Sequence, residues 1–322
     1  MEEKLVCIIN EMAEFLDISQ IKKLQETLVK HLIERETEKK QISNDEFLKM
    51  FLAAKEIEGC SIRTIAYYRV TIEHMLRNIK ESLRRITTEE IRQYLVDYQK
   101  INGCSKVTVD NIRRNISSFF SWLEEEDYIL KSPMRRIHKI KVAKVVKSII
   151  TDEEIEKIRD SCENERDHAM IDLLYSTGMR VGELVRLNKS DVDLSARECL
   201  VFGKGDKERK VYFDARTKIH LEEYLKKRTD NNHALFVSLD RPYDRLKISG
   251  VEIRLREIGN KAKVENVHPH KFRRTMATRA IDKGMPVEQV QKLLGHAQID
   301  TTMQYAIVNQ NNVRESHRRF IA

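Results

Sequence analysis

Apolar residues recur at spacings of three and four along most of this 322-residue chain, which is the pattern of amphipathic helices. Residues 1–42 predict two such helices, which form an N-terminal extension that we expect to contact a protein surface. Four helix start signals follow, at the capping residues Ser43, Ser61, Thr87 and Ser105. Residues 43–130 are therefore predicted to form a small helical bundle.

The pattern changes after residue 130. Residues 131–148 are rich in Lys and Arg and contain no acidic residue, and Pro133 disfavours helix near their start, so we predict a basic interdomain linker. A capping signal at Thr151 starts a second domain over residues 149–322. Within it, residues 198–213 alternate around a charged, glycine-containing turn and predict a β-hairpin. The expected fold is mainly α with a small β-sheet: a helical bundle followed by a mixed α+β domain.

Composition narrows the class of protein. With 41% hydrophobic and 34% charged residues, few Gly and four Pro, the chain is typical of a helix-rich soluble protein. No apolar run approaches the ~18 residues of a membrane span, and the acidic start is unlike a secretory signal, so we expect a cytoplasmic protein. Five scattered cysteines indicate reduced thiols. The net charge of +8 favours a polyanion partner, although many soluble proteins share such a value.

Four segments of the second domain contain side chains that can bind a phosphate group, transfer a proton to or from it, or attack it. Each has an ordinary explanation on its own: an Arg and a Glu three residues apart are usually a surface ion pair, a charged turn is usually solvated, and a tyrosine usually packs. Their order over about 130 residues argues against chance. The candidate residues are Arg180 with Glu183, Lys204 in the hairpin turn, His270 with Arg273 on one helix face, and His296 with Tyr305 nine residues later.

In this order and spacing, the four segments resemble the tyrosine recombinase, or phage integrase, family, in the form seen in Xer-type recombinases and mobile-element integrases. The resemblance covers the second domain with specific motifs and residues 43–130 more loosely, as a core-binding domain, and does not include residues 1–42. It implies an enzyme that cuts and rejoins DNA through a 3′-phosphotyrosine intermediate on Tyr305, without metal, cofactor or ATP. One position departs from the family pattern, because Arg274 stands where a second His is frequent.

The resemblance also implies roles for the other residues. Arg180 and Arg273 would bind the scissile phosphate, His270 would accept or steer the proton of the nucleophile, Lys204 would protonate the leaving oxygen, and His296 would hydrogen-bond the phosphate. The partner would be double-stranded DNA with a specific site, bound by four protomers on two duplexes, with accessory proteins left open. In the family the segment after the tyrosine, here residues 306–322, often packs on a neighbouring protomer.

Basic residues near two helix starts and in the linker are candidates for contacts with the DNA backbone. They are Arg63, Arg69, Lys106, Arg113, Arg114, Arg135, Arg136, Lys139 and Lys141. For the linker residues, a solvated connector is an equally good explanation. Two other functions stay open: a topoisomerase with the same chemistry but no strand exchange, and a DNA-binding regulatory protein whose second domain is inert. The target sequence, and the choice between integration, excision and dimer resolution, lie beyond the sequence.

Overall fold

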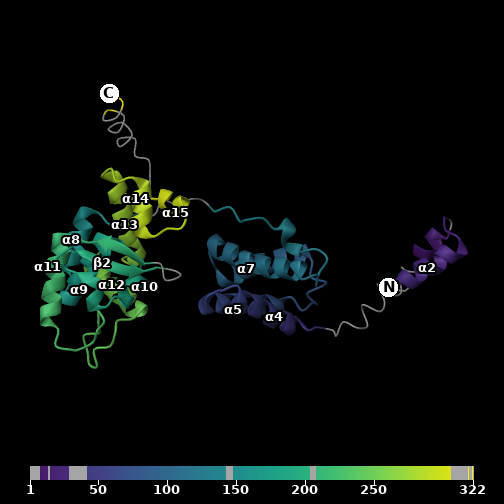
Figure 1. The fold of residues 1–322 in the computed structure, drawn as a ribbon, viewed down its shortest axis with the longest axis horizontal. Coiled ribbons are helices and arrows are strands. Elements are labelled where there is room, and N and C mark those ends of the chain that lie inside the picture. Colours follow the sequence, from purple (N-terminus) through teal and green to yellow (C-terminus); the bar gives the residue numbers. More distant parts are fainter. Residues whose placement is uncertain are drawn as a thin grey trace. The chain divides into compact units, whose positions relative to one another are not determined.

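The chain divides into two units, Met1–Val145 and Val146–Ala322. The computed structural model describes residues 8–13, 15–28, 42–142, 148–203, 208–305, 318 and 321. The N-terminal extension contains helix α2 (Ile18–Leu28) (Figure 1). None of the residues of α2 is buried. This helix lies where the spacing of apolar residues predicts one. The expected contact of residues 1–42 with a protein surface stays a prediction. No described helix has the length and apolar character needed to cross a membrane.

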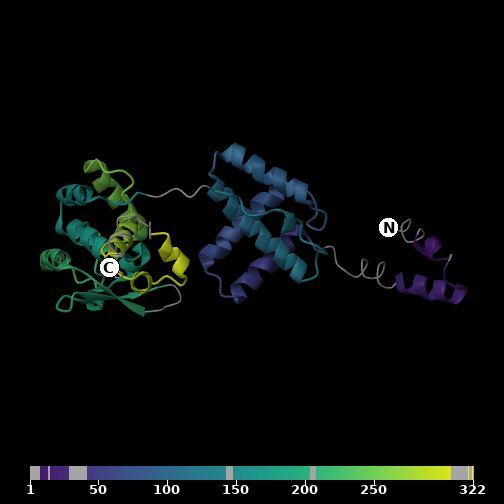
Figure 2. The ribbon, with the colours of Figure 1, turned by 90° about the horizontal axis from the view of Figure 1, so that it is seen from above.

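The first unit contains a bundle of helices that cross one another (Figure 2). They are α4 (Asn44–Ile57), α5 (Ile62–Asn78), α6 (Thr88–Asn102) and α7 (Lys106–Glu125). The structure confirms all four predicted caps, because each Ser or Thr hydroxyl accepts a hydrogen bond from a backbone N–H three residues on. Ser43 and Thr87 form complete capping boxes with their glutamates. The bundle core includes the aromatic residues Phe51, Phe119 and Trp122.

Part of the predicted linker packs on this bundle. Residues 133–136 form the short 3-10 helix η2 (Pro133–Arg136), which contacts α6 and α7 and buries Met134. The carbonyl of Pro133 accepts a hydrogen bond from the Thr88 hydroxyl at 2.7 Å. Further on, the backbone N–H of Ile140 donates to the buried carboxylate of Asp110 at 3.0 Å. The described residues up to 140 are thus held by the bundle, which differs from our expectation of a connector that starts at residue 131.

The second unit combines a three-stranded antiparallel sheet with helices (Figure 1). The strands, in the order β1-β2-β3, are β1 (Val192–Asp193), β2 (Glu198–Phe202) and β3 (Glu208–Tyr212). The helices are α8 (Asp152–Asp160), α9 (Glu165–Thr177), α10 (Val181–Arg186), α11 (Ala215–Lys227), α12 (Ile248–Lys261), α13 (Pro269–Asp282), α14 (Val287–Leu294) and α15 (Ile299–Met303), with the 3-10 helix η3 (Lys189–Asp191) before β1. This arrangement confirms the predicted fold class.

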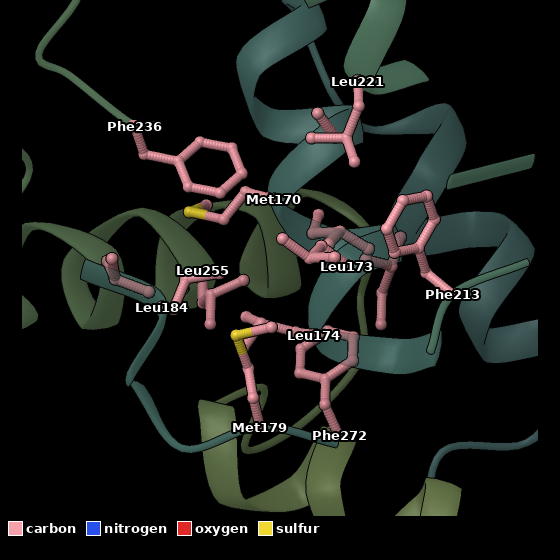
Figure 3. Close-up of a cluster of buried hydrophobic side chains, with 14 of the residues drawn as sticks. Met170, Leu173, Leu174, Met179, Leu184, Phe213, Leu221, Phe236, Leu255 and Phe272 are labelled. Carbon is pink, nitrogen blue, oxygen red and sulfur yellow. The ribbon is translucent and has the colours of Figure 1, made fainter. Parts of the chain in front are cut away.

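Helix α9 is the centre of the second unit. It packs against α11, α13 and β3, and most of its residues are buried, which explains why its apolar positions show little one-sided pattern. Met170, Leu173 and Leu174 on α9 meet Phe272 on α13 and Leu255 on α12 in one apolar core (Figure 3). Because α9 and α13 are packed into this core, the residues that follow α9 and those on α13 are carried on a rigid support.

Candidate active site

Arg180 lies at a bend between two helices. Helix α9 ends at Thr177 and is followed by Gly178 in the left-handed backbone conformation (φ 60°), which glycine adopts without the steric cost of a Cβ, and α10 begins after Arg180. Glu183 accepts a hydrogen bond from the backbone N–H of Arg180 at 2.7 Å and another from its guanidinium at 3.0 Å. The Arg180 side chain is 37% exposed, whereas that of Glu183 is 4% exposed. At this bend the guanidinium of Arg180 is therefore open to solvent and is held by the buried carboxylate of Glu183.

Glu183 also binds a second arginine, Arg209, which the sequence motifs did not single out. Strand β3 begins at Glu208, so Arg209 belongs to the strand and not to the turn. Its guanidinium donates to both oxygens of Glu183, at 2.8 and 2.7 Å, and its Nε donates to the carbonyl of Leu293 at 2.9 Å. Alternation along the strand could have identified Arg209, because it shares the inward face with the buried Val211.

Arg273 is brought to the same place by α13. That helix starts as predicted, with Pro269 in its first turn and His268 as the residue before it. Arg273 is only 3% exposed, and its guanidinium donates to the carbonyls of Gly178 at 2.8 Å and of Leu294 at 2.7 Å. Arg180 reaches the same Leu294 carbonyl at 3.4 Å. The two arginines predicted from distant parts of the sequence thus meet at the end of α14.

His296 and Tyr305 follow directly after this point. The backbone N–H of His296 donates to Gln291, and its Nδ1 lies 2.8 Å from the hydroxyl of Thr302. The rings of His296 and Tyr305 stack with their centroids 6.0 Å apart. Asp300 and Thr301 are residue types that often cap helices, which predicts a helix carrying Tyr305, but this prediction is wrong: α15 begins after Gln298 and ends at Met303, and Tyr305 lies in the turn that follows.

The charges at this site shift its pKa values in a consistent way. Burial lowers the pKa of Arg273 to about 10, and the positive charge of Arg180 adds to this effect, so Arg273 stays protonated at neutral pH. Burial would raise the pKa of the Glu183 carboxyl, but hydrogen bonds from Arg209 and Arg180 outweigh it and the pKa is lowered. Burial and the three arginine charges lower the pKa of His296 to about 4. The cluster is therefore cationic and suited to an anion, and His296 is a neutral ring at pH 7.

The remaining predicted residues are placed differently. His270 is an exposed residue in the first turn of α13, with its ring 6.4 Å from that of His268. Lys204 lies outside the described residues, so its predicted role stays a prediction. Arg274, the departure from the family pattern, donates two hydrogen bonds to the carbonyl of Ser148, at 2.9 and 2.6 Å. Burial lowers the pKa of Arg274, and Tyr305 is close enough to oppose that shift.

The DNA-binding candidates fall into two groups in the first unit. Two of the α7 residues are tied to the protein, because Arg113 and Arg114 both donate through Nε to the buried Asp110, and Arg113 is only 12% exposed. Arg135, 60% exposed, pairs with Glu124. The others are exposed residues: Arg63, Arg69, Lys106, Arg136, Lys139 and Lys141.

Comparison with protein families identifies the chain. A model of the Phage integrase family matches residues 148–312, and a model of the Phage integrase N-terminal SAM-like domain matches residues 47–130. The chain belongs to the phage integrase family. Among its relatives in that family are tyrosine recombinase XerC of Oceanobacillus iheyensis, 30% identical over 85% of this chain and 95% of the relative, and tyrosine recombinase XerA of Pyrococcus horikoshii, 31% identical over 87% and 95%.

Solved structures of other family members share the fold. The Tn1549 transposon integrase in complex with transposon right end DNA superposes with a TM-score of 0.70 and 18% identity, over 86% of this chain and 99% of that chain. A lambda integrase dimer bound to a core site gives a TM-score of 0.69 and 21% identity, over 88% and 85%. The fold and family predicted from the sequence are thus confirmed for this tyrosine recombinase.

Proposed function

We propose that this chain is a site-specific DNA recombinase, which cuts one strand with Tyr305 and rejoins it to a new partner strand. The observation that supports the proposal most is the convergence of Arg180 and Arg273 at the Leu294 carbonyl, within two residues of His296, whose ring stacks on Tyr305. Relatives at about 30% identity over most of the chain are named tyrosine recombinases.

The proposed chemistry is an in-line displacement at a DNA phosphate. The phenol of Tyr305 attacks phosphorus, its O–H proton passing to a base, while the bond to the 5′ oxygen breaks and that oxygen takes a proton. Arg180 and Arg273 would bind the non-bridging oxygens, where negative charge builds up, and both stay charged throughout. His296, neutral at pH 7, would donate a hydrogen bond to the same phosphate.

Two proton transfers complete the proposed step. His270, at the exposed start of α13, would take the proton of the phenol, since a tyrosine with an ordinary pKa of about 10 is a poor nucleophile unaided. Lys204 would give a proton to the departing 5′ oxygen. The 3′-phosphotyrosine keeps the energy of the broken ester, so a 5′ hydroxyl can reverse the step without ATP.

The larger assembly belongs to the same proposal. The first unit, with its exposed basic residues on α5, α7 and the segment after η2, would hold the DNA backbone, and four protomers would join two duplexes. The lambda integrase and Tn1549 integrase structures contain DNA, which supports a DNA partner here. Because the substrate would be cellular DNA, the proposal includes a cytoplasmic location.

The test uses DNA nicked near the cleavage site, so that a short strand diffuses away and the covalent complex accumulates. Wild-type protein should be trapped on DNA, Tyr305→Phe should bind DNA without a covalent product, and Tyr212→Phe, which removes an exposed phenol on β3, should behave as wild type. Equal trapping by Tyr305→Phe would contradict the proposal.

A second part of the test distinguishes a recombinase from a topoisomerase. A recombinase should give strand-exchange products only when two cognate sites are present. Relaxation of supercoiled DNA with no dependence on a second site would favour a topoisomerase. If Tyr305→Phe changed no activity at all, a DNA-binding regulatory protein would be favoured.

A further inference from the structure

We propose that Arg209 is a positioning residue of the active site: it fixes the carboxylate of Glu183 and the end of α14, and through them the guanidinium of Arg180. The inference rests on the proposed function, since it concerns how the phosphate-binding arginine is held. It adds a residue from strand β3 to a site otherwise built from α9–α10, α13 and the end of α14.

The contacts of Arg209 define the orientation of two different segments at once. Its terminal nitrogens meet the two oxygens of Glu183 side by side, and its Nε meets the carbonyl of Leu293. A guanidinium is planar and rigid, so these three hydrogen bonds fix the distance and angle between the α10 carboxylate and the end of α14. A lysine ammonium could satisfy only part of this geometry.

Arg180 depends on both of these segments. Its guanidinium donates to Glu183, and it also donates to the carbonyls of Leu294 and Gly295 at 3.4 and 3.2 Å. Every described partner of the Arg180 side chain therefore belongs to a segment that Arg209 holds. Without Arg209, Glu183 would keep only its hydrogen bonds from Arg180, and nothing would tie its carboxylate to the end of α14.

Hydrogen bonding argues that Arg209 supports the site, because its Nε and both terminal nitrogens already donate to the Leu293 carbonyl and to Glu183. The Arg209 side chain is 12% exposed, whereas that of Arg180 is 37% exposed. Gly295 closes over it, because a Cβ at this glycine would come within 3.1 Å of the Arg209 guanidinium. Two observations explain why position 295 is a glycine: the backbone lies close to the Arg209 guanidinium, and it has a left-handed conformation (φ 64°).

The experiment compares wild type with Arg209→Gln, Arg209→Lys and the control Arg216→Gln, which removes an exposed arginine paired with Glu156 on the same unit. The rate of covalent complex formation is measured at saturating nicked DNA. We expect a loss of about 100-fold for Arg209→Gln, typical of a misplaced catalytic group, and no change in the DNA concentration that gives half the maximal rate. Arg209→Lys should lose about tenfold, the value of one charge-assisted hydrogen bond, and Arg216→Gln should match wild type.

A modified substrate tests whether Arg209 acts through Arg180. In a methylphosphonate, a methyl group replaces one charged non-bridging oxygen at the scissile position, so less charge remains for the arginines to neutralise. The ratio of wild-type to Arg209→Gln rates should therefore fall on this substrate. A role through protonation of the leaving group would leave that ratio unchanged, and so would a general loss of folded protein; either result would overturn the inference.

A double-mutant cycle with Glu183→Gln supplies a second readout. If Arg209 acts through Glu183, the double variant should lose no more activity than the worse single variant, whereas independent effects would multiply. Multiplying losses, or full activity of Arg209→Gln, would refute the positioning role. Failure of the proposed function is distinguishable, because then wild type itself would form no covalent complex.

Discussion

Replacement of Glu183 by Gln tests how strongly one buried carboxylate stabilises the catalytic unit. Glu183 accepts four hydrogen bonds, two from Arg180 and two from Arg209, and it is the counter-charge to a cluster that also contains Arg273. Gln keeps the shape but has one acceptor oxygen, and its NH₂ group would face donors. Loss of one partner from a buried ion pair costs about 3–5 kcal/mol, so we expect a destabilisation of that size.

The expected shift in melting temperature is large enough to measure directly. A unit of this size shifts by about 2–4 °C per kcal/mol, so the transition of the second unit should fall by roughly 10 °C. Far-UV circular dichroism follows both units, while the single tryptophan, Trp122, is buried in the bundle and follows the first unit alone. The control Glu198→Gln breaks the exposed pair with Lys210 and should cost no more than ~1 kcal/mol.

The pH dependence of this effect has a defined sign. Because the pKa of Glu183 is lowered in the folded protein, its contribution is fully present above the ordinary value of 4.5 and is lost as the pH falls through the lowered pKa. The difference between wild type and variant should be complete at pH 7 and shrink in acid. Equal stability of wild type and Glu183→Gln at pH 7 would refute the reasoning, as would a shift confined to the Trp122 signal.

Three further predictions follow from the same structure. Gly178→Ala puts a Cβ on a left-handed backbone and against Met276, and should cost about 1–2 kcal/mol in urea unfolding; no change would contradict the strain. The ring of His296 should titrate near pH 4 by NMR in free protein, so folding stability falls as the pH drops from 6.5 toward 4, and bound DNA should raise that pKa. Asp110→Ala should destabilise the bundle by about 2–3 kcal/mol, read from Trp122 fluorescence; an unshifted transition would show that its hydrogen bonds contribute little.

Most of the local structure could be predicted because local chemistry determines it. The caps at Ser43, Ser61, Thr87 and Ser105 satisfy backbone donors within three residues, so the helix starts depend on nothing distant. The start of α13 at Pro269 has the same character. These local signals were sufficient to predict the mainly helical fold and the helix that holds Arg273.

The parts that sequence reasoning missed depend on tertiary contacts. Alternation along β3 places Arg209 on the inward face and Lys210 on the outward face, but the partner of Arg209, Glu183, comes from another element and has no local signal. Met134 and the rest of η2 sit in a stretch with many basic residues, and their packing on the bundle has no local signal. Tyr305 was assigned to a helix from a capping pattern, but α15 ends before it.

The arginine cluster is oriented largely by main-chain oxygens, those of Gly178, Leu293, Leu294 and Gly295. Such acceptors exist whatever side chain a residue carries, so evolution can exchange the apolar side chains at the end of α14 for others of similar volume. A single inserted or deleted residue in α14 is different, because it would rotate the carbonyls of Leu293, Leu294 and Gly295 by about a quarter of a turn and move these three away from the guanidinium groups together. The length of this segment should therefore be under stronger selection than its composition.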